Sequence, residues 1–279
     1  MIAICPNPYR DNNLILTGEV IRMLKGEGLE SCVCPVFVNE NDCFTGDIKT
    51  EKLQDVLPLL SHVIVIGGDG TILAVVRQLG GKPLPILGIN LGTKGFMTAL
   101  EPEELARISV AFRNDVPISL RMMVDVTLIR GGKTVLNDTA LNDVVIHGYG
   151  ECIQPTAWAD GKKMFSFSGD GLVIATPTGS TGYSMSAGGP IVEPNARAIL
   201  LTPICAHTMT AKPFVLSPER AVRVLTEKLT GRRAYLAVDG YQVADLESGD
   251  LLELNVSEKN VCMIELSQRS FFERLEKLV

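Results

Sequence analysis

The sequence has no apolar run that approaches the ~20 residues of a membrane-spanning helix. Its start, MIAICPNPYRDNN, lacks the charged and then apolar plan of a signal peptide. The formal net charge of −6 leaves no excess of basic residues, which non-specific binding to nucleic acid or to an anionic membrane surface would need. These absences predict a cytoplasmic protein whose partners are neither nucleic acids nor membranes.

Cysteines are scattered and lack the spacing of a metal site. The seven cysteines include no Cys-x-x-Cys pair and stand at positions 5, 32, 34, 43, 152, 205 and 262. An odd, dispersed set is typical of reduced thiols in an ordinary core, not of a disulfide framework or a zinc site. With 46% hydrophobic and 21% charged residues, the sequence predicts a globular protein with a substantial core.

The common nucleotide and hydrolase motifs are also missing. GGKT at 131–134 ends like a P-loop, but Thr127 stands where the first glycine is required, so we interpret it as a turn between strands. The glycines of GINLGTKGF do not have the Gly-x-Gly-x-x-Gly spacing. There is no nucleophile elbow, and the three histidines form no recognisable triad.

At roughly 100–200 residues per domain, 279 residues allow one large domain or two ordinary ones. A change of sequence pattern along the chain favours two. The first third combines a helix over residues 14–25 with apolar strand-like runs: IAIC, CVCPVFV, HVIVI and PILGIN. Runs without polar alternation are typical of parallel strands covered on both faces. We therefore predict an α/β N-terminal domain, with a Rossmann-like or flavodoxin-like parallel sheet, over residues 1–121.

From about residue 122 the pattern is that of β-strands, with period-two runs separated by turn residues. Asp160 and Gly161 give a strong hairpin signal. A short helix is expected after Pro194, in NARAILLT, and an amphipathic helix in the tail RSFFERLEKLV. We predict a mainly-β C-terminal domain over residues 122–253 and a segment, residues 254–279, that returns to the first domain.

The stretch HVIVIGGDGTIL, residues 62–73, raises the first functional question. A buried strand ends in Gly67-Gly68-Asp69-Gly70, and the apolar positions that follow share one face of a helix. Glycines let a ligand approach the backbone closely, and the free N–H groups at a helix start favour phosphate. This strand, turn and helix therefore predict a phosphate site.

Asp69 in that turn has two interpretations. It can cap the helix, as aspartate does in many proteins, for about 0.5–2 kcal/mol. Alternatively it takes part in phosphoryl transfer, because a carboxylate beside phosphates is repelled unless a metal ion bridges the charges or the carboxylate accepts a proton.

The second informative stretch is SGDGLVIATPTGSTGYSMSAGGPIVEP, residues 168–194. A strand opens into a long run of Gly, Ser, Thr and Pro, too rich in small polar groups for a simple turn. Its hydroxyls and N–H groups can bind a nucleoside, and Tyr183 offers a face for stacking. The alternative is an ordered surface loop with Tyr183 packed in the core.

Three motifs together resemble the bacterial NAD kinases: GGDGT at 67–71, LND at 141–143 and GDGLVIATPTGSTGYSMSAGGPIV at 169–192. GGDGT alone also resembles diacylglycerol and sphingosine kinases and phosphofructokinases. The resemblance implies transfer of the γ-phosphoryl group of ATP to the 2′-hydroxyl of the adenosine ribose of NAD, giving NADP, with Mg²⁺ or Mn²⁺. It further implies a homodimer or homotetramer, with ATP and NAD meeting between the two domains.

The resemblance also assigns roles to residues. Asp69 would accept the hydroxyl proton, and no metal ligand is assigned to a protein side chain. Asp170 would face the nicotinamide end of NAD, and Phe96 would line the cleft. The implied phosphate-binding and ATP-binding positions are Gly67, Gly68, Gly70 and Thr71. The implied NAD-binding positions are Asp69, Gly70, Phe96, Asn142, Asp143, Asp170, Thr178, Thr181, Gly182, Tyr183 and Ser186.

The chain departs from the family pattern in places. Gly182 replaces the usual alanine, and Tyr241 follows VDG where many members have glutamine, so no binding role is carried onto Tyr241. Two other functions are weighed against NAD kinase: a lipid kinase of the diacylglycerol or sphingosine type, and a non-catalytic NAD(H)-binding sensor. The sequence leaves the phosphoryl donor open between ATP, another triphosphate and polyphosphate.

Overall fold

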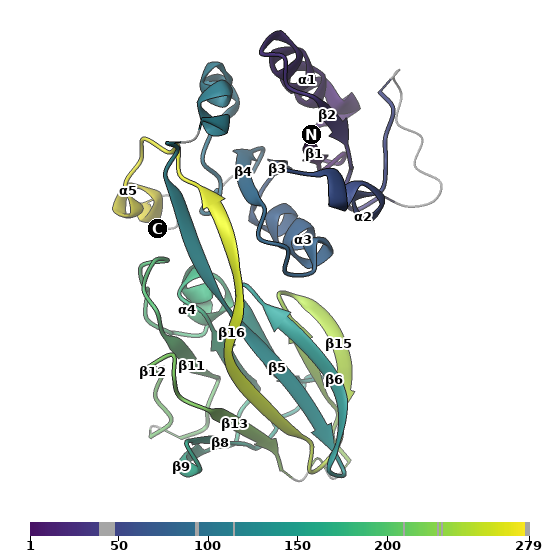
Figure 1. Cartoon of the computed structure of the whole chain (residues 1–279). Coiled ribbons are helices and arrows are strands. Elements are labelled where there is room, and N and C mark those ends of the chain that lie inside the picture. Colours follow the sequence, from purple (N-terminus) through teal and green to yellow (C-terminus); the bar gives the residue numbers. More distant parts are fainter. Residues whose placement is uncertain are drawn as a thin grey trace. The chain divides into compact units, whose positions relative to one another are not determined.

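The chain divides into two units in a computed structural model (Figure 1). One unit comprises Met1–Leu120 with Val261–Val279, and the other comprises Arg121–Asn260. The structure describes residues 1–38, 48–92, 95–113, 115–208, 210–227, 229 and 231–276. No helix within these ranges is long and apolar enough to cross a membrane.

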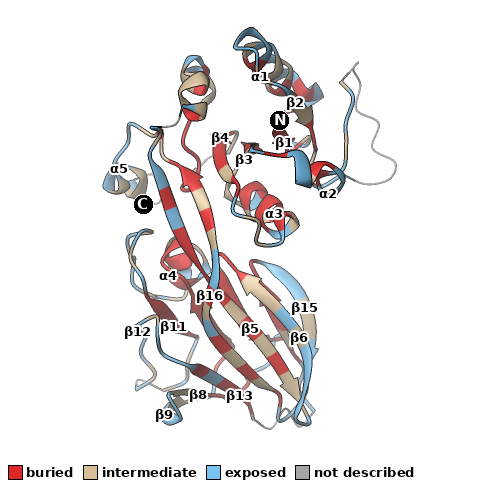
Figure 2. Cartoon of the chain, viewed as in Figure 1, coloured by how far each residue is buried: buried red, intermediate tan, exposed pale blue. Residues whose placement is uncertain are grey.

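The first unit is built on a parallel sheet. Its strand order is β2-β1-β3-β4, followed by the end of β16, which pairs in parallel with β4. The strands of this sheet are β1 (Ile2–Pro6), β2 (Ser31–Val33), β3 (His62–Gly67), β4 (Pro85–Asn90) and β16 (Leu251–Ile264). Nearly every residue of β1, β3 and β4 is buried (Figure 2). The predicted parallel α/β fold is therefore confirmed.

Helices cover this sheet and share its core. The amphipathic helix α1 (Ile15–Gly26) buries Val20 and Leu24 in a cluster with Ile4 and Ile64. The other helices of the unit are α2 (Leu53–Val56), α3 (Asp69–Leu79), α5 (Phe271–Glu276) and the 3₁₀ helices η1 (Asn12–Leu14), η2 (Leu57–Leu59) and η3 (Pro102–Phe112).

The order of the strands marks where a ligand is expected. The chain runs from β1 to β2 on one side of β1 and then to β3 on its other side. In open parallel sheets, ligands bind outside the carboxyl ends of the strands where the order reverses in this way. The residues that follow β1 and β3 therefore lie at the default binding edge, and the glycine turn is among them.

The second unit is antiparallel. One sheet has the order β12-β11-β10-β7-β14-β15, and its side chains share a core with the strands β5, β6, β8, β9, β13 and β16. The strands not yet given are β5 (Ile118–Arg130), β6 (Lys133–Ala140), β7 (Asp143–Gly148), β8 (Pro155–Ala159), β9 (Lys162–Ser166), β10 (Gly171–Ala175), β11 (Ile199–Ile204), β12 (Phe214–Leu216), β13 (Val222–Thr226), β14 (Ala234–Val238) and β15 (Tyr241–Leu246). The mainly-β second domain is confirmed.

Two local predictions were wrong. NARAILLT does not form a helix, because Ile199–Ile204 is a fully buried strand that pairs with both β10 and β12. CVCPVFV was expected to be a strand throughout, but β2 ends at Val33. Pro35 has no N–H to donate to a ladder, and Phe37 has a φ of 61°. The hairpin at Asp160-Gly161 is confirmed, with φ of 49° and 75°.

Candidate active site

The glycine turn joins β3 directly to α3. Gly67 is the last residue of β3, Gly68 is the N-cap of α3, and Asp69 is the first helical residue. A Cβ atom at Gly67 would overlap the side chain of Thr71, so only glycine allows this close approach. Thr71 is 2% exposed and its hydroxyl accepts a hydrogen bond from the amide of Asn7. Thr71 therefore supports the turn from within the first unit.

The Asp69 carboxylate is held by a different loop. Its Oδ2 accepts the N–H of Phe96 at 3.0 Å, and its Oδ1 accepts the N–H of Met97 at 2.9 Å. Within the described ranges, the N-cap of α3 has no side-chain cap hydrogen bond. The helix-cap interpretation of Asp69 is therefore wrong, because both carboxylate oxygens bind backbone donors outside the helix.

Burial decides the proton affinity of Asp69. Desolvation raises the pKa of this carboxyl above its ordinary value, while the N–H groups of Met97 and Phe96 and the charge of Arg274 oppose the rise. The net direction is upward. A carboxylate with a raised pKa is a stronger base, and its orientation is fixed by two donors.

Phe96 lies beside this carboxylate. The residue is 7% exposed, and its ring meets that of Phe271 edge to face, with centroids 5.8 Å apart. Phe96 thus contributes its N–H to Asp69 and its ring to the packing of α5. The structure brings the predicted residues of the first unit together around one turn and one loop.

Arg10 is a residue of this edge that the sequence analysis missed. Its Nη1 donates to the carbonyl oxygen of Leu91 at 3.1 Å, and the exposed guanidinium lies within 4 Å of a Cβ position built on Gly68 or on Gly92. Arg10 follows β1, the neighbour of β3 in the sheet. No local pattern in NPYR marks Arg10, because its place at this edge depends on the order of the strands, which the structure gives.

The other predicted residues lie in the second unit, where Asp239 organises their backbone. Its carboxylate accepts the N–H groups of Leu141, Asn142 and Asp143 at 2.9, 2.6 and 3.1 Å. Asp239 has a φ of 49° and is followed by Gly240 with a φ of 81°, in the hairpin between β14 and β15. The sequence left the role of this VDG turn in doubt. Tyr241 begins β15 and is exposed.

The long polar loop within residues 168–194 packs against the backbone of Leu141 and Asn142. It is not irregular throughout, since it contains the 3₁₀ helix η4 (Thr178–Thr181) and the single turn α4 (Tyr183–Ser186). The hydroxyl of Thr176 donates to the carbonyl oxygen of Leu141 and accepts the N–H of Gly179. A Cβ atom at Gly179 would overlap the carbonyl oxygen of Asn142. Glycine at 179 is thus what lets the loop reach the LND segment.

A substitution at this contact should separate two neighbouring glycines. Gly179→Ala should lower the free energy of unfolding by about 1–3 kcal/mol, because the Asn142 backbone must move to admit the methyl group. Gly182→Ala is the matched control, since its Cβ would lie 3.3 Å from the nearest atom, the carbonyl oxygen of Gly179. Chemical denaturation of both variants checks this, and equal losses would contradict it.

Two buried polar atoms at this contact have no partner. Among the described residues, Oδ1 of Asn142 and Oγ1 of Thr178 are buried and make no hydrogen bond. Such atoms are rare in native proteins because leaving them unsatisfied costs free energy. Asp143 lies next to Asn142, and burial, followed by the charge of Asp239, raises its pKa to about 7. This group of atoms points to a polar ligand.

Tyr183 lies near this group and is exposed. Its side chain is 39% exposed, so the interpretation that it packs in the core is wrong. Its ring is stacked with that of His147 at 6.5 Å, and His147 is stacked in turn with Tyr235 at 5.7 Å. Asp170 lies nearby, and its hydrogen bond raises the pKa of the Cys205 thiol.

The remaining predicted residues also belong to this unit. The hydroxyl of Thr181 donates to the carbonyl oxygen of Thr178 at 3.4 Å. Gly182 is the residue between η4 and α4, and Ser186 is exposed at the end of α4. The structure therefore gathers the predicted nucleoside-binding residues of the second unit around LND and the polar loop.

Comparisons with known proteins match the whole length of this arrangement. Residues 2–115 match the ATP-NAD kinase N-terminal domain, and residues 141–266 match the ATP-NAD kinase C-terminal domain. An NAD kinase from Geotalea daltonii is 34% identical over 277 residues, which are 98% of this chain and 96% of that protein.

Two solved structures share the fold. A yeast NADH kinase in complex with NADH is 24% identical, with a TM-score of 0.84 over 99% of this chain and 85% of the other. An NAD kinase from Archaeoglobus fulgidus in complex with ATP is also 24% identical, with a TM-score of 0.76 over 100% of this chain and 98% of the other. By these matches, and as its motifs indicated, the chain belongs to the ATP-NAD kinase family of phosphotransferases.

Proposed function

We propose that this chain transfers the γ-phosphoryl group of ATP to the 2′-hydroxyl of the adenosine ribose of NAD, with Asp69 as the base. NAD kinase function follows from membership of the family, whose substrates are NAD and ATP. The assignment of the base is carried by one observation: a buried carboxylate at the glycine turn, held by two N–H groups and not used as a helix cap. A lipid kinase is no longer favoured by any feature.

The proposed chemistry needs a base because a ribose hydroxyl is a poor nucleophile. As the 2′-oxygen attacks the γ-phosphorus, its proton passes to the Asp69 carboxylate and ADP leaves. Each carboxylate oxygen already accepts one N–H and retains a second lone pair for the hydroxyl. The two N–H groups fix the direction of that lone pair without neutralising the charge.

The glycine turn and Arg10 are proposed to hold the phosphates. The first turn of α3 has N–H groups without helical partners, and these favour an anion. The Arg10 guanidinium beside Gly68 adds a positive charge at the same edge. Both features are suited to a triphosphate, because the planar guanidinium can donate two N–H groups to phosphate oxygens.

The divalent ion is proposed to come with the substrate. Within the described ranges, no three His, Cys, Asp or Glu side chains gather closely enough to hold a metal. Mg²⁺ is commonly bound through substrate phosphates and its own waters. We therefore propose that Mg²⁺ or Mn²⁺ enters with ATP as part of the substrate, and we derive no step from a protein-bound metal.

The adenosine part of NAD is proposed to bind in the second unit. The unpaired Oδ1 of Asn142 can accept a hydrogen bond from an amino or hydroxyl group, and the unpaired hydroxyl of Thr178 can donate or accept one. Asp143 beside them adds a carboxyl group, and Tyr183 a stacking face. Asp170 is proposed for the nicotinamide end.

Tyr183→Ala should weaken NAD binding about tenfold, because it removes stacking on an exposed ring face. Tyr183→Phe keeps the ring and is the matched control. Isothermal titration with NAD measures both variants. Equal affinity for Tyr183→Ala and the unmodified chain would contradict a stacking role for the ring.

A coupled assay for NADP formation tests the proposed function. Purified protein is incubated with NAD, ATP and Mg²⁺, beside reactions that omit each component and one in which polyphosphate replaces ATP. NADP that requires NAD, ATP and the metal is the expected result, and the polyphosphate reaction decides the donor range. Folded protein that binds NAD but forms no NADP with any donor would favour the sensor function and overturn the proposal.

We also propose a homodimer or homotetramer in the cytoplasm. The edge strand β12 exposes Phe214 and Val215, at 37% and 54%, and an apolar edge strand favours pairing with another chain. A monomeric mass by light scattering would contradict the oligomer.

A further inference from the structure

The C-terminal helix α5 packs on the loop that holds Asp69. Phe271 of α5 meets the Phe96 ring edge to face, at an interplanar angle of 89°. The Arg274 guanidinium lies 6.0 Å from the centroid of the same ring, and its Nη1 donates to the carbonyl oxygen of Phe96 at 3.5 Å. Only 13% of the Arg274 side chain is exposed. Arg274 thus contacts both the ring and the backbone of Phe96.

Phe96 links Arg274 to the carboxylate. Its carbonyl oxygen accepts from Arg274 while its N–H donates to Asp69. The next N–H, that of Met97, holds the other carboxylate oxygen. A shift of this short segment would therefore change both hydrogen bonds of the base at once.

The charge of Arg274 also acts on Asp69. The guanidinium lowers the pKa of this carboxyl and so opposes the larger effect of burial. Glu265 lies 4.0 Å from Nη1 of Arg274, and the Arg10 guanidinium lies near the glycine turn. Arg274 Nε is buried and has no hydrogen-bond partner among the described atoms. Because the guanidinium is only weakly paired, little of its positive charge is offset before it acts on the Asp69 carboxylate.

We infer that Arg274 is a positioning residue for phosphoryl transfer, which holds the Phe96–Met97 backbone on the Asp69 carboxylate. The inference rests on the proposed role of Asp69 as the base. It makes the C-terminal segment part of the catalytic unit, although Arg274 and Phe96 are 178 positions apart in the sequence.

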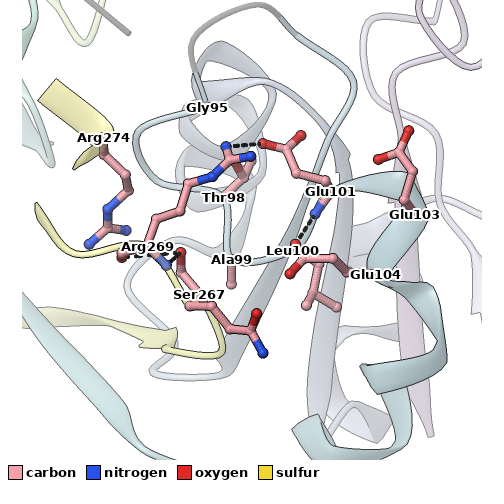
Figure 3. Close-up of a pocket in the computed structure, with 11 residues that line it drawn as sticks. Gly95, Thr98, Ala99, Leu100, Glu101, Glu103, Glu104, Ser267, Arg269 and Arg274 are labelled. Carbon is pink, nitrogen blue, oxygen red and sulfur yellow. Dashed lines mark hydrogen bonds and ion pairs between the residues drawn. The ribbon is translucent and has the colours of Figure 1, made fainter. Parts of the chain in front are cut away.

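A neighbouring arginine provides a matched control. Arg269 and Arg274 line the same cavity of about 350 Å³, together with Gly95, Thr98 and Glu101 (Figure 3). Arg269 pairs with Glu101, with Nη1 2.9 Å from Oε1 (Figure 3), whereas the hydrogen bond to the Phe96 carbonyl oxygen comes from Arg274. Arg269→Met therefore removes a charge of the same sign from the same cavity without touching the loop contact.

The test is the pH dependence of kcat and kcat/KM for Arg274→Met, Arg274→Lys and Arg269→Met. Arg274→Met should lower kcat about tenfold, as expected when the alignment of a catalytic group is loosened, with little change in KM for NAD or ATP. The acid limb of its pH–activity profile, where activity falls as pH falls, should move to higher pH, because losing the positive charge raises the pKa of Asp69. Arg274→Lys should restore the limb but only part of kcat, and Arg269→Met should change neither.

An acid limb for Arg274→Met that superimposes on that of the unmodified chain would overturn the inference. If Arg274→Met does not fold, Arg274→Gln, a shorter side chain that keeps a hydrogen-bond donor and has no charge, must show the same displacement. Asp69→Asn is measured alongside: full activity of that variant would defeat the proposed base itself. A loss of activity in Asp69→Asn with an undisplaced limb in Arg274→Met would defeat only the role of Arg274.

Discussion

Replacing Asp69 by asparagine should lower kcat by about two to four powers of ten while leaving the affinity for NAD nearly unchanged. The amide has the size of the carboxylate and can still accept an N–H from the Phe96–Met97 loop. It cannot accept the proton of the ribose hydroxyl, so the loss falls on the chemical step. Steady-state kinetics of NADP formation, with isothermal titration of NAD, separates the two effects.

The pH profile gives the same prediction a second readout. A general base acts only in its ionised form, so activity should fall as pH falls through the pKa of Asp69. Burial raises that pKa, which places the acid limb above the range of an ordinary aspartate. In Asp69→Asn this limb should disappear from the residual activity.

Asp55→Asn is the matched control. Asp55 is an exposed acidic residue in the first turn of α2, the position in which a carboxylate only stabilises a helix. Its replacement should leave kcat and the acid limb unchanged. If Asp69→Asn behaved like Asp55→Asn, Asp69 would have no part in catalysis.

Local patterns were sufficient to predict the glycine turn. An apolar run, two glycines, an acid and a second apolar run define a strand, a turn and a helix within twelve residues, and the structure has them as β3 and α3. The order of the strands was not predictable in this way. It depends on which strands pair, so the reversal between β1 and β3, and Arg10 with it, appeared only in the structure.

Contacts between distant segments explain the other gaps. Asp239 binds N–H groups 96 to 98 positions away, and Arg274 binds a carbonyl oxygen 178 positions away. No spacing rule for a helix or strand reaches across such separations. The motifs LND and VDG can each be found in the sequence. The hydrogen bonds by which Asp239 of VDG supports the backbone of LND could not be predicted from it.

Competition between local preference and pairing explains the error at NARAILLT. Alanine, arginine and leucine are good helix formers, and so the sequence favoured a helix. In the structure Ile199–Ile204 lies between β10 and β12 with every residue buried. Burial on both faces of a sheet outweighs a helix preference of a few tenths of a kcal/mol per residue.

Asp239→Asn should destabilise the second unit strongly. The carboxylate accepts three N–H groups from Leu141, Asn142 and Asp143. An asparagine has one oxygen and turns an NH₂ group toward these donors, so at least one buried N–H loses its partner. The free energy of unfolding should fall by about 2–4 kcal/mol. Asparagine tolerates the left-handed backbone at φ 49°, so the loss reports on hydrogen bonding.

The same variant should weaken NAD binding by at least about tenfold, because the backbone it releases carries Asn142 and Asp143. Removing the negative charge of Asp239 should also lower the pKa of Asp143 from about 7, since that charge contributes to its elevation. If Asp143 contacts NAD, the pH at which NAD affinity changes should move downward with it. Titration of NAD at pH values between 5 and 9 measures both effects. In the unmodified chain the midpoint of the pH dependence is expected at ~7, the pKa of Asp143.

Asp160→Asn distinguishes this support from a general effect of hairpin turns. Asp160 has the same φ of 49° and also precedes a glycine in a two-residue turn, between β8 and β9. It is exposed, and its carboxylate pairs with Arg220 and accepts one N–H, that of Ala221. Its replacement should leave the thermal midpoint and NAD affinity nearly unchanged. If Asp239→Asn were as mild as Asp160→Asn, the three hydrogen bonds would not be what holds Asn142 and Asp143 in place. The nucleoside site would then depend on the polar loop and its contact at Gly179.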